Sequence, residues 1–497
     1  AANDLATKLT VSGACTVSNE VALGTSGARF AEVNVEKGTF VSAQAVRVRK
    51  FHFGSGALFL AAKGGLDYSW TCFDLAAGAV ADLTNNNYGE GVGAFSGAGT
   101  VRGFRGKLSL PDGPYVFSGT CENMPNGNMC DWTINPIGAQ SVDAHALVIG
   151  SANALSNCAV RLPTSEGRSL RFASGIGTFR IGEFAPSSAQ SLYLADEADT
   201  PVAVFCRVTE SALSNTLTSG PGDLYVGNRS NNMIAYTGAT LFAHTGILGA
   251  MAGVMGQGGQ NTYFGDKVDA ANDAKVDGLA GVAGYNLGES YASVRNYFRN
   301  VNAFTLKGLY GNGLFQFEGA GAATIQDFAV TPIDGKIPHV VLNANGGDVT
   351  IETARAGACN LQLGVGRTLT VNGGALGSVE EQAVLNAPGF GTGGDGTLIL
   401  NGATLHAQMD SCARRIEVWG GGVLACYGRL NVPTSATAAD PATLHVDGGT
   451  LRAVWPAGGY WNIELPQAGV SARQKISVGS NGARFDVARD NTEYGLV

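Results

Sequence analysis

Residues Leu369–Leu376 read LTVNGGAL, and this phrase decides the fold. Apolar residues alternate with polar ones at Leu369 and Val371, as in a β-strand that buries one face. The Asn-Gly pair that follows supplies the left-handed backbone conformation of a sharp corner. Another apolar residue, Leu376, then begins a second short strand. The phrase therefore predicts two strands joined at a glycine corner.

The same phrase returns several times along the chain. It reads LILNGATL at Leu398–Leu405 and LHVDGGTL at Leu444–Leu451, and a variant with one more glycine reads IEVWGGGVL at Ile416–Leu424. Near the start, Leu9–Cys15 opens in the same way. Recurring strands with glycine corners predict an all-β, right-handed parallel β-helix, a β-solenoid with loop insertions of varied length.

The two ends of the chain also match each other. VALGTSGARF at Val21–Phe30 agrees in residue type with ISVGSNGARF at Ile476–Phe485. These phrases resemble the autotransporter-associated β-strand repeat of bacterial surface and secreted proteins, most strongly over 360–490. The resemblance implies a parallel β-helix in an exported protein. It carries no catalytic residues across, and no membrane-barrel translocator follows, so we expect a fragment or another export route.

The pattern divides the chain into three regions. We expect β-helix coils over 1–227 and over 301–497, with an irregular insertion or elaborated loop region over 228–300. The middle region is rich in Gly, Ala and Met and lacks clean alternation. Within it, Tyr291, Val294 and Phe298 fall at helical spacing, which predicts a short helix over 290–299.

Composition supports a solenoid. Glycine makes up 72 of 497 residues, roughly twice the usual ~7%. Charged residues are 14%, against about 25% in a typical soluble domain, although 45% of residues are hydrophobic.

The net charge of −8 without a basic block gives no support to nucleic-acid binding. No apolar run is long enough to predict a transmembrane helix. The Ala-Ala start fits the remainder of a cleaved signal peptide.

Nine cysteines are present, without zinc-like spacing. Cys121 and Cys130 bracket the polar loop ENMPNGNM, and Cys412 and Cys426 bracket a predicted strand and its turn. Both pairs are candidate disulfides in an oxidising compartment. Buried free thiols remain the alternative, since cysteine packs well as a small apolar residue.

Acidic residues cluster at one place in the middle region, which makes it a weak calcium candidate. Closely spaced oxygen ligands in a loop can hold calcium. The cluster lacks the spacing and the glycine of an EF-hand, and a hydrated loop is the competing interpretation. Its members are Asp266, Asp269, Asp273 and Asp277, with Asn272 among them. No other cofactor is predicted.

Catalytic motifs of β-helical carbohydrate enzymes do not occur in the sequence. The strings typical of polygalacturonases and pectate lyases are missing, and the six histidines are spread singly. The adjacent Glu380 and Glu381 are best explained as a solvated pair. The tryptophans at 70, 132, 419, 455 and 461 are either sugar-stacking platforms or packing anchors. We therefore predict no catalytic residues, although carboxylates on neighbouring coils could still meet.

These observations lead to two hypotheses of function. The first is a secreted structural or adhesive protein of a bacterial surface, an extracellular fibre or a matrix, with self-association or a glycan or host-surface ligand. The second is a β-helix that binds or cleaves a polysaccharide. A phage tailspike would need trimer-forming apolar ends that the sequence does not identify.

Overall fold

The computed structural model describes the greater part of the chain. The described residues are 3–20, 22–23, 28–44, 46–62, 68–86, 89–111, 113–136, 145–162, 168–185, 191–208, 216–228, 233–235, 241–250, 260–264, 284–286, 294–332, 335, 337–386, 395–408, 411–427, 430, 432–433, 435–454 and 473–488. They fall into two compact units, the first of residues 1–229 and 242–246 and the second of residues 230–241 and 247–497.

The first unit is built from short strands. They are β1 Asn3–Val11, β2 Thr16–Ser18, β3 Ala28–Val35, β4 Thr39–Ser42, β5 Val48–Phe53, β6 Leu58–Ala61, β7 Tyr68–Leu75, β8 Val80–Asp82, β9 Glu90–Gly97, β10 Thr100–Arg102, β11 Arg105–Leu108, β12 Tyr115–Phe117, β13 Thr120–Glu122, β14 Cys130–Ile134, β15 Leu147–Ile149, β16 Leu155–Arg161, β17 Leu170–Phe172, β18 Thr178–Ala185, β19 Leu192–Tyr193, β20 Ala203–Val208, β21 Thr216–Gly220, β22 Asp223–Asn228 and β24 Leu241–His244.

The second unit has the same construction. Its strands are β23 Met233–Ala235, β25 Ile247–Ala250, β26 Gln260–Phe264, β27 Gly284–Asn286, β28 Val294–Phe298, β29 Phe304–Gly311, β30 Leu314–Phe317, β31 Ala323–Val330, β32 His339–Leu342, β33 Val349–Ala356, β34 Asn360–Leu363, β35 Thr368–Val371, β36 Gly374–Leu376, β37 Val384–Leu385, β38 Thr397–Asn401, β39 Thr404–Gln408, β40 Arg415–Trp419, β41 Val423–Tyr427, β42 Ala442–Asp447, β43 Gly449–Val454, β44 Gln474–Val478 and β45 Ala483–Ala488.

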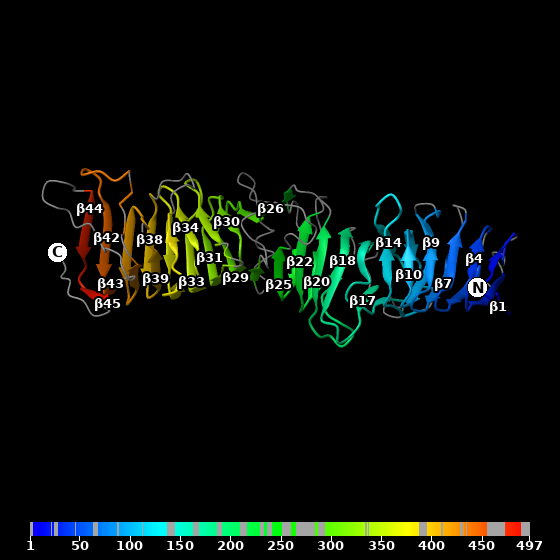
Figure 1. The fold of residues 1–497 in the computed structure, drawn as a ribbon. Coiled ribbons are helices and arrows are strands. Elements are labelled where there is room, and N and C mark those ends of the chain that lie inside the picture. Colours follow the sequence, from blue (N-terminus) through cyan, green and yellow to red (C-terminus); the bar gives the residue numbers. More distant parts are fainter. Residues whose placement is uncertain are drawn as a thin grey trace. The chain divides into compact units, whose positions relative to one another are not determined.

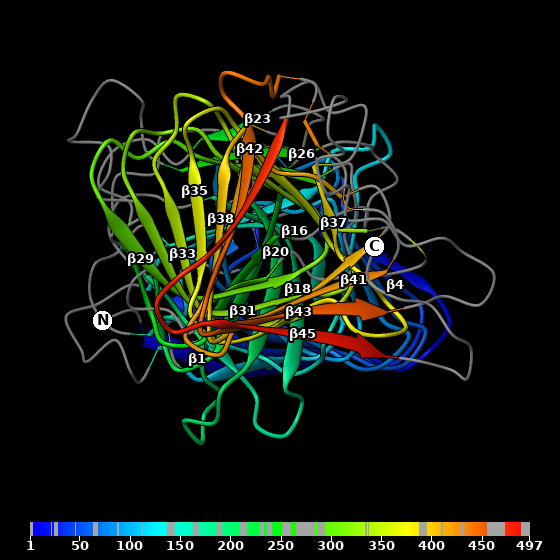
Figure 2. The same cartoon turned by 90° about the vertical axis from the view of Figure 1, so that its left-hand side faces the viewer.

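Strands that are one coil apart in sequence pair in parallel, which makes each unit a β-solenoid. In the first unit one sheet runs β1, β3, β5, β7, β9, and a second runs β2, β4, β6, β8, β10, β13 (Figure 1). In the second unit β41, β43 and β45 lie one behind another, as do β38, β40, β42 and β44 (Figure 2). The predicted parallel β-helix architecture is confirmed.

The repeated phrases stack directly on one another. Leu369 pairs with Leu398, which pairs with Ile416, and the row continues through Leu444 to Ile476. The second apolar position behaves in the same way, from Val371 through Leu400 and Val418. These side chains are buried, with 0 to 2% of their surface exposed from Leu369 to Ile416. The apolar positions from Leu369 to Val446 therefore form continuous rows inside the solenoid, whereas Ile476 is half-buried and Val478 is 52% exposed.

Glycine fits the corner between the two strands of a phrase for two reasons. Gly374 has a φ of +78°, in the left-handed region, and a Cβ atom there would lie 1.9 Å from the Ala354 carbonyl oxygen. A side chain at this position would meet both a strained backbone and a steric clash.

The middle region contains six described strands, β23 to β28. The short helix predicted over 290–299 is wrong, because Val294–Phe298 is strand β28, paired in parallel with β26 and β30. Strand β27 pairs in the same way with β29. Ten residues can satisfy a helical and a strand pattern at once, and here pairing with the neighbouring coils decides for the strand.

Candidate functional site

A row of polar side chains crosses the outer face of the first unit. Strand alternation turns Val33 and Val35 into the interior, where both are fully buried, and leaves Glu32 and Asn34 of β3 outside. Register then aligns Asn34 with His52 of β5, His52 with Asp74 of β7, and Asp74 with Ser96 of β9. Parallel stacking thus brings together residues that are about one coil apart in sequence.

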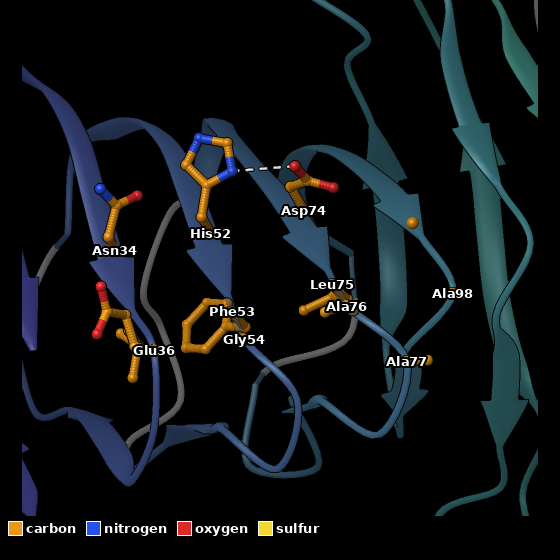
Figure 3. A pocket seen from close by; sticks show the side chains of 12 residues that line it. Asn34, Glu36, His52, Phe53, Gly54, Asp74, Leu75, Ala76, Ala77 and Ala98 are labelled. Carbon is orange, nitrogen blue, oxygen red and sulfur yellow. Dashed lines mark hydrogen bonds and ion pairs between the residues drawn. The ribbon is translucent and has the colours of Figure 1, made fainter. Parts of the chain in front are cut away.

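His52 is held between two carboxylates. Its Nε2 lies 2.7 Å from Glu32 Oε1. Its Nδ1 lies 2.9 Å from Asp74 Oδ2, the contact drawn as a dashed line in Figure 3. An imidazole donates from both nitrogens only when it is protonated. The imidazole therefore bridges two carboxylates that belong to the coils on either side of it.

Lysine and serine side chains complete the network. Lys8 Nζ lies 2.5 Å from Glu32 Oε2, Lys50 Nζ lies 3.8 Å from Asp74 Oδ2, and Ser96 Oγ donates to Asp74 Oδ1 at 3.2 Å. The hydrogen bond from Lys8 is the main reason that the pKa of Glu32 is lowered, and His52 contributes in the same direction. Glu32 is therefore a carboxylate in ordinary conditions.

An open pocket of about 490 Å³ lies beside this row. Asn34, Glu36, His52 and Asp74 supply its polar lining, and exposed Ala76, Ala77 and Ala98 form part of its apolar lining (Figure 3). Carboxylates and an amide can accept hydrogen bonds from hydroxyl or ammonium groups. The pocket lining therefore places hydrogen-bond acceptors next to an apolar surface.

The geometry of the row does not favour bond cleavage. Glycoside hydrolysis needs two carboxyl groups with the scissile bond between them. The imidazole of His52 already occupies the space between Glu32 and Asp74. These two carboxylates are therefore placed to hold the ring.

A second pocket, of about 370 Å³, lies over β17 and β19. The guanidinium of Arg168 stands 3.4 Å from the ring centroid of Tyr193 and also donates to Asp199 at 3.1 Å. Desolvation opposes ionisation of Asp196, but backbone N–H groups of Thr200 and Ala198 hold its pKa below the ordinary value. This pocket is smaller than the one beside His52, and its polar groups interact with one another, so it is the weaker candidate.

The predicted calcium cluster cannot be placed. Asp266, Asp269, Asp273 and Asp277 lie outside the described residues. In the part of the chain that the structure describes, no group of three or more His, Cys, Asp or Glu side chains is arranged to hold a metal ion. The calcium site stays a prediction.

All nine cysteines carry free thiols in the structure. Cys121 and Cys130 are both buried in the first unit, Cys426 is buried in the second, and Cys412 is half-buried. Whether thiols bond depends on the redox state of the compartment as well as on geometry. Both disulfide pairings stay predictions.

The described tryptophans differ in their exposure. Trp132 is fully buried and packs on Phe95, with ring centroids 5.2 Å apart. Trp70 and Trp419 keep 44% and 38% of their surface exposed. Trp455 and Trp461 lie outside the described residues.

Sequence reasoning treated His52 as an isolated histidine. Its partners Glu32 and Asp74 lie 20 and 22 residues away (52 − 32 and 74 − 52), which is one coil in each direction. Polar residues separated by the length of one coil are the signal of such a row. The repeats do not define the coil length in this part of the chain.

Among the described residues, the structure contains no helix with the length and hydrophobicity to cross a membrane. Comparison with known proteins gives no matching family model, no matching curated protein and no matching solved structure.

Proposed function

We propose that the protein is a secreted structural or adhesive β-solenoid of a bacterial surface, an extracellular fibre or a matrix. The observation that supports this most is the continuity of side-chain rows from coil to coil, inside and outside. Each coil is fixed by its neighbours, which is how a solenoid becomes a stiff spacer. Loops between strands are then free to vary and to make contacts.

The outer rows are cross-linked by polar groups as well as by backbone pairing. Arg102 of β10 bridges Asp82 of β8 at 3.2 Å and Glu122 of β13 at 2.7 Å. In the second unit Asn372 donates to Glu352 at 2.9 Å, and Asn401 donates to Asn372 at 3.2 Å. Single exposed pairs of this kind contribute little. Because such pairs recur along the stack, together they favour one register between neighbouring coils.

A structural or adhesive protein acts by binding and assembly without turnover. The test combines sedimentation velocity and electron microscopy over rising protein concentration with binding to immobilised bacterial envelope and extracellular-matrix preparations. We expect either concentration-dependent assembly or saturable surface binding, and no consumption of polysaccharide. A monomer that binds none of these surfaces, or one that degrades a polysaccharide, would overturn the proposal.

The second candidate function is polysaccharide binding, and the pocket beside His52 is the observation that favours it. Glu36 and Asp74 offer carboxylate acceptors next to an apolar lining of alanines. A glycan array probed with the wild type and with Asp74→Asn tests it, and Glu352→Gln is the control because it lies in a polar row of the other unit. Binding that Asp74→Asn weakens several-fold and the control leaves unchanged supports the candidate, and equal binding by all three proteins rejects it.

A further inference from the structure

Three cysteines of the first unit come together inside the solenoid. Cys121 lies in β13, Cys130 is the first residue of β14, and Cys158 lies in β16. Only 2%, 0% and 0% of their surfaces are exposed. Sequence spacing suggested the first two as a pair, and the fold adds the third.

Backbone contacts tie the three positions to one another. Cys130 and Cys158 are register partners on the neighbouring parallel strands β14 and β16. The Cys130 thiol donates to the carbonyl oxygen of Glu122, the residue after Cys121, at 3.2 Å. Asn157, the residue before Cys158, donates from Nδ2 to the carbonyl oxygen of Cys121 at 3.2 Å. These contacts place Cys121 close to both Cys130 and Cys158.

The three thiols also influence one another's ionisation. Cys121 interacts with the side chains of Cys130 and Cys158, and its strand β13 packs against β16. Burial raises the pKa of Cys121, and it raises the pKa of Cys158 to about 11. The hydrogen bond with Cys121, followed by burial, raises the pKa of Cys130. All three are protonated thiols at neutral pH.

Strand geometry selects which of them can bond. Register partners on parallel strands project side by side, about 4.8 Å apart. A disulfide needs Cβ atoms about 3.5–4.5 Å apart, so Cys130 and Cys158 are poorly placed to bond each other. Cys121 approaches both from β13. We propose that this cluster is an oxidisable thiol site in which Cys121 forms a disulfide with Cys130, and Cys158 can replace Cys130 as its partner.

The oxidant in this proposal is a small-molecule disulfide, RSSR. The Cys121 and Cys130 thiols lose two protons and two electrons as their S–S bond forms, and RSSR is reduced to two RSH. In the exchange step, the Cys158 sulfur attacks Cys121 Sγ and the Cys121–Cys130 bond breaks. The proton lost by Cys158 ends on Cys130, so the number of disulfides is unchanged.

Burial also sets when the bond forms. The thiolate is the attacking species, and burial keeps these thiols protonated. Oxidation of the folded protein is therefore slow, and oxidation during folding is fast. Once formed, the disulfide closes the loop from Glu122 to Met129 onto the coil that contains β14. This inference is independent of the proposed function.

The experiment is refolding of the full chain in a buffer of reduced and oxidised glutathione, followed by alkylation under denaturing conditions and peptide mapping. Among the six cysteines of the first unit, we expect one linked peptide pair in the wild type, Cys121 with Cys130, and four alkylated cysteines. Cys130→Ala should move the link to Cys158. Cys121→Ala should leave all remaining cysteines of the first unit alkylated. The oxidised wild type should melt a few degrees higher than its reduced form.

Cys206→Ala is the matched control, because Cys206 is a fully buried cysteine of the same unit outside the cluster. It should keep the Cys121–Cys130 link, and far-UV circular dichroism should show that every variant folds. Full alkylation of the refolded wild type would overturn the proposal. The proposal would also be overturned if Cys121 of the wild type formed its main disulfide with a cysteine other than Cys130. A Cys130–Cys158 disulfide in Cys121→Ala, as abundant as the Cys121–Cys130 disulfide of the wild type, would overturn it as well.

Discussion

At the scale of single residues, corners of this solenoid differ in how strictly they need glycine. Gly374 and Gly421, both in the second unit, have φ values of +78° and +82°. A Cβ at Gly374 would clash with the Ala354 carbonyl group, whereas a Cβ at Gly421 would meet no atom within 4 Å. The two positions therefore separate the conformational cost of a side chain from its steric cost.

Gly421→Ala should destabilise the second unit by about 1–2 kcal/mol, the cost of left-handed backbone for a residue with a Cβ. Gly374→Ala should cost about 1–3 kcal/mol more, because the new methyl group must displace backbone of the neighbouring coil. Urea unfolding followed by circular dichroism measures both. If the two variants lost the same free energy of unfolding, the backbone near Gly374 would have to relieve the clash without an energetic cost.

Asp327 gives the second unit a dependence on acid pH. Arg355 and Tyr310 both donate to its carboxylate, and the hydrogen bond from Arg355 is the largest cause of its lowered pKa. A carboxyl group with a lowered folded-state pKa stabilises the fold above its unfolded-state pKa of about 3.9. That contribution is lost as the pH falls toward the folded-state pKa.

Asp327→Asn should therefore reduce stability near pH ~7 by less than about 1 kcal/mol, since the pair is exposed. Near pH ~3 the difference from the wild type should be smaller. Urea midpoints at the two pH values are the measurement, with Asp348→Asn as a control that lies outside this network. A difference that does not shrink at low pH would contradict the assignment.

The contacts between individual side chains of the site were the part of the structure that the sequence predicted least well. His52 has no charged residue beside it in the sequence that marks it as special, and Glu32 and Asp74 become its partners only through the register of β3, β5 and β7. Register depends on the length of each turn. Here those lengths vary, so side-chain partners across coils could not be assigned from the sequence.

At the scale of elements, rows of stacked aromatic rings hold the first unit together. Phe73 of β7 lies between Phe51 of β5 and Phe95 of β9, with ring centroids 5.6 and 5.7 Å apart. Trp132 of β14 continues the row after Phe95. One ring therefore supports the packing of two neighbouring coils.

Phe73→Ala should destabilise the first unit by about 3–5 kcal/mol, as expected for truncation of a buried aromatic side chain. Val116→Ala is the control, because Val116 of β12 is an apolar strand residue of the same unit with 46% of its surface exposed. It should change stability by less than about 0.5 kcal/mol. Chemical denaturation of each variant gives the comparison, and a small effect of Phe73→Ala would mean that the neighbouring rings collapse into the space.

Elements were predicted well where phrases repeat and poorly where they do not. The phrases at Leu369, Leu398 and Leu444 became strand pairs that stack in register. Over 290–299 the apolar residues fit a helix, but Val294–Phe298 is a strand. Backbone hydrogen bonds to β26 and β30 stabilise the strand, and the sequence of a ten-residue segment does not show which neighbours it will pair with.

At the scale of the whole molecule, the chain consists of two compact units, each with its own interior rows. We expect two transitions in urea, one for each unit. Phe73→Ala should move only the transition of the first unit, and Leu424→Ala, which truncates a fully buried side chain of β41, only that of the second. A single transition shifted by both variants would show that the units unfold as one.

Coil length varies in the second unit without disturbing the register of its strands. Thr368 pairs with Thr397, 29 residues later, whereas Thr397 pairs with Arg415 after only 18. The first of these coils is thus eleven residues longer (29 − 18) than the second, and the strands of both keep their register. A gene with this architecture can gain or lose segments at its turns while every buried side chain keeps its neighbours, which makes such turns suitable places to insert a foreign peptide for display.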